Sequence, residues 1–257
     1  MALTEYFVRY LQRRDSLSVA DLEKLRSIPT ETRSFAPGET MVSAGSDIDR
    51  SCLMLRGMAG RLHILRGNST QTVITALHVP GDFVDLHAFV LSGIEHSVIA
   101  VGPAEAEFID HAVLTEITEN YPHLTRLLWM STAIDAAIHR QWLVAANALR
   151  SSAHLAHLIC EIYTRLAAVG AARDHRLTLP LLQRELANIL GYSSIHINRA
   201  VRDLRDRKLV RWSGTEIEVL DWPGLVRLAV GLESIEDIVA DLEEGVQKAN
   251  ATTYGLG

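Results

Sequence analysis

Cysteine is scarce in this chain of 257 residues, which contains only Cys52 and Cys160. The two lie far apart and form no Cys-x-x-Cys pair, so we expect neither a disulfide framework nor an iron–sulfur cluster. No apolar run is long enough to span a membrane, and the N-terminal segment MALTEYFVRYLQRRDS lacks a signal-peptide pattern. These absences predict a cytoplasmic protein without a membrane partner.

The chain also lacks an overall excess of positive charge, because it has 25 Lys and Arg but 31 Asp and Glu, which gives a net charge of −6. The charge is unevenly distributed, however. Arg176–Gly214 contains 8 Lys and Arg against 3 Asp and Glu, whereas Thr215–Gly257 contains 2 against 9. The basic segment is therefore the part of the chain that would be attracted to the phosphates of a nucleic acid.

Two short helices joined by a tight turn are predicted within Leu181–Trp212. The first, Pro180–Leu190, has apolar residues at helical spacing, and Pro180 suits a first helical turn. Gly191 can end that helix in the left-handed conformation, and Ser193 is a good N-cap for the second. The first helix has its apolar face at Leu182, Leu186, Ile189 and Leu190. The second is expected to bury Ile197, Val201 and Leu204 and to expose Asn198, Arg199, Arg202 and Arg205. This arrangement is typical of a helix-turn-helix that reads DNA.

The chain before this module falls into a short helical part and a β-rich part. Thr4–Arg14 and Val19–Arg26 are predicted helices, the second capped by Ser18. Glu31–Asp110 has short strands separated by Gly-containing turns, which predicts a small β-sandwich or barrel. The clearest strands are Ser51–Gly57, Arg61–Gly67 and Thr72–His78. The glycines expected to need positive φ in hairpins are Gly38, Gly45, Gly57 and Gly81.

A long helix without Pro or Gly is predicted at His123–Leu149, after a shorter helix at Val113–Tyr121 that Pro122 stops. Its apolar residues recur at three- and four-residue spacing, which favours pairing with a second copy of the chain. The alternative is a helix that packs only on its own barrel. The residues predicted at the dimer interface are Leu124, Leu127, Ile134, Ile138 and Ala145.

Elements after the long helix complete the predicted organisation. Ser151–Ala168 is a further helix, Arg211–Leu220 alternates as a small hairpin or wing would, and Asp221–Val230 and Ile235–Ala249 look helical. The predicted domains are a sensor barrel with flanking helices (1–122), a dimerisation helix (123–150), a winged helix-turn-helix (151–222) and an acidic helical extension (223–257).

The order helix, barrel, long helix and winged helix-turn-helix resembles the Crp/Fnr superfamily of bacterial transcription regulators. The resemblance covers roughly Leu22 to Asp221. The segments that carry it are FAPGETMVSAGS (Phe35–Ser46), LMLRGMAGRL (Leu53–Leu62), HVPGDFV (His78–Val84) and ELANILGYSSIHINRAVRDLRDRKLV (Glu185–Val210). It implies an α+β fold with an N-terminal cyclic-nucleotide-binding-like β-barrel (jelly roll). It also implies a non-enzymatic, homodimeric regulator under allosteric control, with palindromic double-stranded DNA and RNA polymerase as partners.

The resemblance also implies an effector pocket after the Pro-Gly-Asp-Phe segment. Nucleotide-binding members place a Glu and an Arg-Ser pair there, but this chain has Leu86 and His96 before Ser97, so cyclic AMP is not expected to bind. The iron–sulfur members carry an N-terminal cysteine cluster that this chain lacks. Haem ligation by His87 is not favoured, because a lone histidine is more often structural. With these three excluded, the expected effector is an unidentified small molecule. The pocket candidates are Gly81, Asp82, Phe83, Asp85, Leu86, His87, His96 and Ser97.

The start of the second helix is the part that the resemblance places in the major groove. The DNA-binding candidates are Ser193, Ser194, Ile195, His196, Asn198, Arg199 and Arg202. Arg199 matches the family's base-reading arginine, which suits the edge of guanine, whereas Ile195 replaces a frequent Glu and can contact only a thymine methyl. The remaining basic residues are expected to contact phosphate or to stay solvated; they are Arg205, Arg207, Lys208 and Arg211.

Two other classes of function remain as alternatives. A metal-dependent, cupin-like enzyme could use His63, His78 and His87, but the barrel has no closely spaced His-x-His with a nearby carboxylate. We therefore expect no metal site and no catalytic activity. The second alternative is an effector- or protein-binding module whose helix-turn-helix makes only protein contacts, and the basic segment argues against it.

Overall fold

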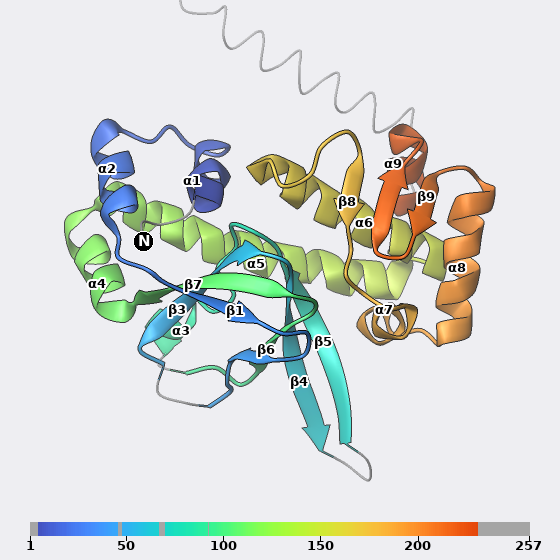
Figure 1. Cartoon of the computed structure of the whole chain (residues 1–257), viewed down its shortest axis with the longest axis horizontal. Helices are drawn as coiled ribbons and strands as arrows, with labels where there is room; N and C mark the ends of the chain where they lie inside the picture. The colour runs from blue at the N-terminus through green and yellow to red at the C-terminus, as the bar shows by residue number, and fades with distance from the viewer. Residues whose placement is uncertain (1–4, 46–47, 67–69, 92, 231–257) are drawn as a thin grey trace, which may run out of the picture.

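The computed structural model describes residues 5–45, 48–66, 70–91 and 93–230 (Figure 1). The predicted helix Ile235–Ala249 and most of the predicted acidic extension lie outside these ranges. Two N-terminal helices precede a β-rich region, a long central helix and a C-terminal α+β unit, which confirms the predicted α+β class. None of the described helices is long and apolar enough to cross a membrane.

The N-terminal helices are α1 (Glu5–Gln12) and α2 (Val19–Ser27), close to their predicted bounds. Ser18 caps α2 as expected, because its Oγ accepts a hydrogen bond from the Asp21 N–H at 3.1 Å. The Asp21 carboxylate accepts one in return from the Ser18 N–H at 2.9 Å. This reciprocal capping box satisfies two backbone groups that a helix start leaves open.

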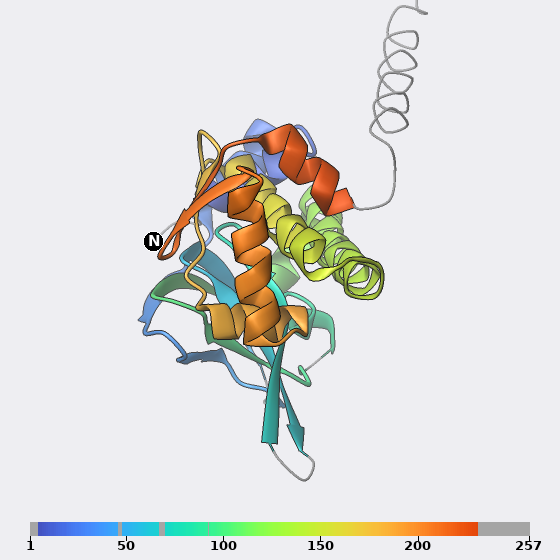
Figure 2. The ribbon, with the colours of Figure 1, turned by 90° about the vertical axis from the view of Figure 1, so that its right-hand side faces the viewer.

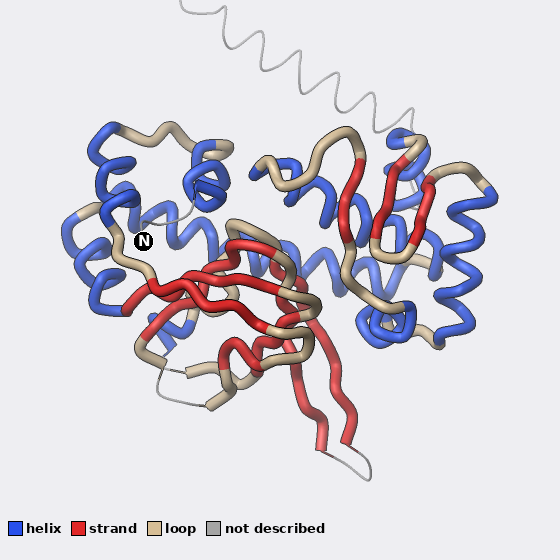
Figure 3. Tube along the Cα trace, viewed as in Figure 1, coloured by secondary structure: helices blue, strands red, loops and turns tan. Residues whose placement is uncertain are grey.

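The β-rich region consists of two antiparallel sheets (Figure 3). One has the order β1-β7-β3, with β1 (Glu31–Phe35), β7 (Ala104–Asp110) and β3 (Arg50–Arg56). The other has the order β2-β6-β4-β5, with β2 (Thr40–Val42), β6 (Ser97–Ala100), β4 (Ala59–Arg66) and β5 (Thr70–His78). The region is jelly-roll-like, but its described strands do not close into the predicted barrel. The four glycines predicted to need positive φ all have it: Gly38, Gly45, Gly57 and Gly81.

Three helices follow the sheets, apart from the short α3 (Ala88–Leu91) inside the β-rich region. They are α4 (His111–Asn120), α5 (Pro122–Ala148) and α6 (Ser151–Val169). Pro122 ends α4 as predicted, but it also occupies the first turn of α5, where its missing N–H costs no hydrogen bond. In Figure 1, α5 extends from the N-terminal helices to the C-terminal unit, so one rigid element contacts both ends of the molecule.

The C-terminal unit is a winged helix-turn-helix. It contains β8 (Arg176–Thr178), α7 (Gln183–Leu190), α8 (Ser194–Asp206), β9 (Val210–Ser213), β10 (Glu216–Val219) and α9 (Trp222–Val230). The predicted wing is the β9–β10 hairpin. α9 falls in the extension predicted from residue 223, but it buries Leu225 and Ala229 in the same apolar core as α6 and α8. The described start of that extension is therefore part of the helix-turn-helix core.

The first helix of the module starts later than predicted. α7 begins at Gln183, so Pro180 precedes the helix instead of occupying its first turn. The Glu185 carboxylate accepts a hydrogen bond from the Leu182 N–H at 2.6 Å, which fixes the helix start at this point. Leu182 is consequently 52% exposed and does not belong to the buried face on which it was placed.

The β-rich region and the C-terminal unit pack directly on each other. Leu77 of β5 lies in the same apolar cluster as Ile159 of α6 and Leu186 of α7. Gly102, in the turn between β6 and β7, lies against Pro180. A Cβ atom added at residue 102 would stand 2.8 Å from the Cβ of Pro180, which is closer than two such atoms pack. Glycine at this position therefore permits the close approach of the two parts.

Candidate nucleic-acid interface and effector pocket

α8, one of the helices at the C-terminal end of the chain (orange in Figure 2), is held in place by its apolar stripe and by its N-terminal cap. Ile197, Val201 and Leu204 are all buried, as predicted. The Ser193 Oγ accepts a hydrogen bond from the His196 N–H at 3.4 Å, which confirms the predicted N-cap. Gly191 ends α7 with a φ of 72°, as the predicted turn requires. The helix is thus presented on a rigid scaffold.

The opposite face of α8 is open to solvent at its N-terminal end. All seven predicted reading residues are exposed there, namely Ser193, Ser194, Ile195, His196, Asn198, Arg199 and Arg202. Ile195 is 63% exposed, so it contributes little to the core of its own chain. An apolar side chain presented in this way on a basic helix can contact a thymine methyl group, while Arg199 can form two hydrogen bonds to guanine.

Two of the polar reading residues are oriented by their own helix. The Asn198 side-chain amide donates to the Ser194 carbonyl at 3.0 Å, which leaves its oxygen available as an acceptor. The His196 Nδ1 lies 2.8 Å from the Ser193 Oγ. These contacts restrict the rotamers of both side chains before any ligand arrives and so reduce the entropy that binding costs.

The other basic residues of the module are exposed, as expected, but three of them also make contacts within the chain. Arg205 donates to the Trp212 carbonyl, Arg207 pairs with Asp203 at 2.9 Å, and Arg211 pairs with Glu218. Arg205 and Arg211 therefore tie α8 and β9 into the wing. The helical pattern could not reveal this, because the contacts depend on how the hairpin folds back on α8.

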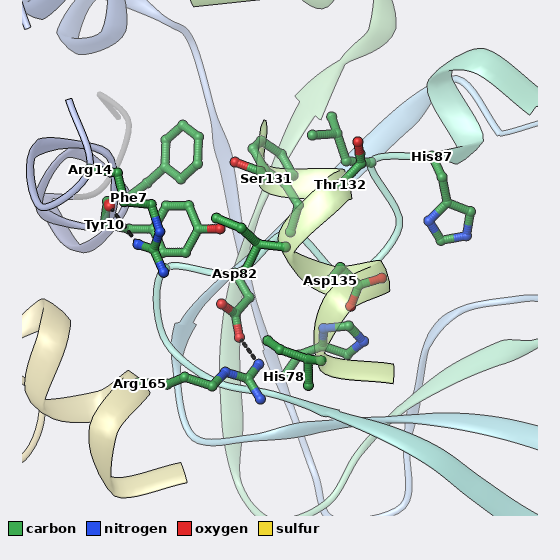
Figure 4. Close-up of a pocket in the computed structure, with 15 residues that line it drawn as sticks. Phe7, Tyr10, Arg14, His78, Asp82, His87, Ser131, Thr132, Asp135 and Arg165 are labelled. Carbon is green, nitrogen blue, oxygen red and sulfur yellow. Dashed lines mark hydrogen bonds and ion pairs between the residues drawn. The ribbon is translucent and has the colours of Figure 1, made fainter. Parts of the chain in front are cut away.

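A small pocket lies at the junction of α1, the β-rich region, α5 and α6 (Figure 4). Tyr10 lines it from α1 and Arg14 from the turn that follows α1, Ser131 and Asp135 line it from α5, and Arg165 from α6. Five of the eight predicted effector residues also line it, namely Gly81, Asp82, Phe83, Leu86 and His87. A molecule bound here would contact the N-terminal helix, the β-rich region and both long helices, α5 and α6.

The other three predicted effector residues lie outside this pocket. Asp85 is fully buried, and its Oδ1 accepts a hydrogen bond from the Cys52 N–H at 2.7 Å. Burial raises the pKa of Asp85 to about 7. Ser97 accepts a hydrogen bond from the Ala44 N–H at 3.2 Å. His96 is buried beside Glu95, and burial lowers the pKa of its imidazole to about 4, so the ring is neutral at pH 7.

A chain of buried polar contacts connects the pocket to α6 and α5. Arg165 donates to Asp82 at 2.5 Å and to Glu161 at 2.6 Å. Glu161 in turn accepts a hydrogen bond from the Trp142 indole at 2.6 Å. Burial opposes the charge on Arg165, but the two carboxylates outweigh it and raise the pKa of the guanidinium. The Pro-Gly-Asp-Phe segment is thereby tied to both long helices.

A second polar contact connects the four-stranded sheet to α5. Arg61 of β4 donates to Asp135 at 3.1 Å and contacts the His139 ring at 2.9 Å. Burial opposes ionisation of Asp135, but the neighbouring His78 and Arg61 outweigh it and lower the pKa of that carboxyl. The ion pair places Asp135 at the edge of the pocket with a negative charge.

Several of these residues are not predicted by any local pattern in the sequence. Tyr10, Arg14, Asp135 and Arg165 come from segments far apart in the chain, and no local pattern shows that they meet. One signal was available, because Glu161 and Arg165 stand four residues apart on a largely apolar helix. Two opposite charges at that spacing on a buried face indicate a paired internal contact.

Three of the five residues predicted at a dimer interface are buried within their own chain, which corrects their assignment: Leu124, Leu127 and Ala145. For Ile134 and Ile138, which are partly exposed, contact with a second copy stays a prediction. Leu124 and Leu127 are buried against the N-terminal helices, and Ala145 is only 2% exposed. Ile134 and Ile138 line the pocket. A different face of α5 is open, with Trp129 at 72% and Leu143 at 66% exposure. Spacing alone cannot tell which apolar face of a long helix packs on its own chain.

Comparison with known proteins agrees with this architecture. Residues 153–228 match the Crp-like helix-turn-helix domain. The transcriptional regulatory protein btr of Bordetella pertussis is 25% identical over 214 residues, which cover 83% of this chain and 87% of that protein. The transcriptional activator protein FnrA of Stutzerimonas stutzeri is 23% identical, with 84% and 87% coverage. The structure of FixK2 from Bradyrhizobium japonicum superposes with a TM-score of 0.71 at 17% identity, covering 80% of this chain and 100% of that one.

The fold and the exposed basic helix define a DNA-binding protein with a winged helix-turn-helix joined to a jelly-roll region. The resemblance to the Crp/Fnr superfamily that the sequence predicted is confirmed by the domain match and by the relatives. The chain is a DNA-binding transcription regulator that is similar to those of Crp/Fnr type.

Proposed function

We propose that the chain acts in the cytoplasm as a homodimer that binds a palindromic DNA operator and then influences RNA polymerase. The observation that carries this proposal is the capped, rigidly held start of α8, which exposes Ile195, Arg199 and Arg202 together. One such helix in each of two copies would enter successive major grooves about one helical turn apart. Selection of bound sequences from a random DNA pool tests this directly, and an enriched inverted repeat is the expected result.

Replacing Arg199 by alanine should remove sequence discrimination. A bidentate contact to guanine contributes about 1–3 kcal/mol of discrimination, so the preference at one base pair should fall by roughly tenfold or more. Fluorescence anisotropy with the selected operator and single-base variants measures this. Lys208→Ala is the matched control, since it should weaken all sequences alike and reduce the salt dependence. Retained discrimination in Arg199→Ala would contradict the assignment.

For the dimer we propose the open face of α5 as the contact with the second copy. Its exposed positions alternate at spacings of four and three residues, as in a coiled-coil seam. They are Trp129, Ala133, Ala136, Arg140, Leu143 and Asn147. The two alanines would permit close approach of the helices, and Trp129 and Leu143 would supply apolar area at the two ends.

Replacing Leu143 by glutamate should separate the two copies. Each copy loses the burial of a leucine, about 2 kcal/mol, so the dimer dissociation constant should rise by roughly a thousandfold. Sedimentation equilibrium measures the shift. Val90→Glu is the control, because Val90 is 76% exposed but lies on α3. If the Leu143→Glu variant remains a dimer and still binds the operator, the dimer contact does not lie on this face of α5.

We further propose that a small effector at the junction pocket controls the orientation of the reading helices. Asp82 supports this, because it lines the pocket and also holds Arg165 of α6 at 2.5 Å. A ligand that competes for Asp82 would weaken the contact with α6, whereas one that binds beside it would strengthen that contact. Either change shifts the balance between two arrangements of the protein.

We propose that the effector is neither cyclic AMP nor an iron–sulfur cluster nor haem, because the residues around the predicted effector pocket do not suit these groups. Leu86 offers no hydrogen bond to a ribose. Glu95 beside His96 would repel a cyclic phosphate, so calorimetry should detect no micromolar binding of cyclic AMP. Cys52 is buried in the core, which does not suit an iron–sulfur ligand. His87 is flanked by the His96 ring, a setting that does not single it out for haem.

A further inference from the structure

Three potential metal ligands converge in the four-stranded sheet, outside the junction pocket. One ligand atom from each of His63, Glu95 and His96 lies within 4.8 Å of the others. They come from two segments that are distant in the chain, since His63 belongs to β4 and the other two immediately precede β6. The sequence alone predicts no metal site here, because the three residues are not close together along the chain.

The strand register explains why these residues meet. β4 and β6 are antiparallel, with Leu62 opposite Ser97. One step further along, His63 faces His96, and residues opposite each other on such strands point to the same side. The two imidazole centroids are 5.4 Å apart. Two rings bound to one tetrahedral ion, with bonds of about 2.0–2.1 Å, would have centroids roughly 5 Å apart.

His96 also carries a buried nitrogen without a partner. The residue is 2% exposed, and its Nε2 has no hydrogen-bond partner among the described residues. Its Nδ1 lies 3.2 Å from the Glu95 carboxylate, which leaves the second nitrogen unexplained by the fold. A buried polar atom in this state costs stability, and an ion bound at Nε2 would remove that cost, with the Glu95 carboxylate turning from Nδ1 to the ion.

We propose that His63, Glu95 and His96 bind one divalent transition-metal ion of the zinc class. Two imidazoles and one carboxylate are ligands that such ions prefer, whereas Mg²⁺ and Ca²⁺ prefer oxygen alone. The ligand atoms must close by about 1 Å to reach the usual spacing, and Glu95, at 75% side-chain exposure, can move. The nearby cation, Arg61, is already paired with Asp135 at 3.1 Å.

His87 is the candidate for a fourth position. Its ring centroid lies 5.4 Å from that of His96, the same separation as on the His63 side. His87 is only half-buried, so its side chain can turn toward the ion. With His87 in place the site is closed, and without it a water completes the coordination.

Cobalt titration of the untagged full-length protein, first dialysed against a chelator, tests the site. Co²⁺ in a four-coordinate site gives strong visible absorption, so one equivalent per chain should produce these bands, and added Zn²⁺ should abolish them. His63→Ala and Glu95→Gln should each weaken binding at least roughly tenfold. Both residues are on the accessible side of the cluster, so these variants are expected to fold, and circular dichroism checks that they do.

His175→Ala is the control, because this histidine is exposed and lies in the C-terminal unit. It should bind cobalt as the unmodified protein does. No cobalt bands, or bands that survive in His63→Ala, would overturn the proposal. The titration contains no DNA, so its outcome is independent of whether the proposed operator binding holds.

Discussion

Replacing Arg165 by methionine should lower the free energy of unfolding by about 3–5 kcal/mol. The substitution leaves Asp82 and Glu161, whose side chains are 14% and 13% exposed, without the cation that compensates them. It also removes the donor to the Leu77 carbonyl, at 3.0 Å in the native protein. Methionine keeps most of the apolar stem, so the loss reflects the charge and not a cavity.

Chemical denaturation of the purified variant measures this effect. Arg173→Met is the matched control, because Arg173 is exposed and its replacement should change stability by less than about 0.5 kcal/mol. Adding Asp82→Asn to Arg165→Met should restore part of the lost stability, since it removes one of the two unpaired carboxylates. If Arg165→Met unfolds like the control, the network does not hold the three parts together.

Replacing Asp85 by asparagine should remove a pH dependence of stability. Burial raises the pKa of Asp85 to about 7 in the folded protein, against about 3.9 in an unfolded chain. Between these values the unfolded chain has lost the proton and the folded protein still holds it, so stability falls as pH rises from about 4 to about 7. The total loss is on the order of 4 kcal/mol, taken from the shift of about 3 pKa units.

The difference in unfolding free energy between Asp85→Asn and the unmodified protein isolates this effect, because other titrating groups cancel. The variant should gain in relative stability from pH 5 to pH 8, and the difference should level off above the folded-state pKa. Asparagine keeps an oxygen that can accept from the Cys52 N–H, so the local backbone contact survives. Parallel pH profiles for the two proteins would mean that Asp85 ionises normally.

Local patterns in the sequence predicted the helix-turn-helix well. Gly191, Ser193 and the stripe of Ile197, Val201 and Leu204 have the predicted roles, because turns, caps and amphipathic faces depend on neighbouring residues. The bounds of α7 were less accurate. The packing of Pro180 against Gly102 and the Glu185 cap move the helix start by three residues.

Contacts between distant parts of the chain could not be predicted from the same patterns. Leu124, Leu127 and Ala145 were predicted to contact a second copy but are buried in their own chain, because more than one face of α5 carries apolar side chains. The network around Arg165 joins residues up to 88 positions apart, since it includes the Leu77 carbonyl. His63 and His96 are brought together only by the register of β4 and β6. Such pairings depend on which strands lie side by side in the sheet, and local patterns in a single sequence do not show this.

The missing side chain at Gly102 has a consequence for the operator. In the proposed dimer, the separation of the two α8 helices must match one turn of DNA. That separation depends on how closely each C-terminal unit sits against its own sheets, and the limiting contact is between Gly102 and Pro180. A single methyl group at residue 102 would act as a wedge in both copies. In that dimer, the preferred length between half-sites would therefore be set, in part, far from any atom that touches DNA.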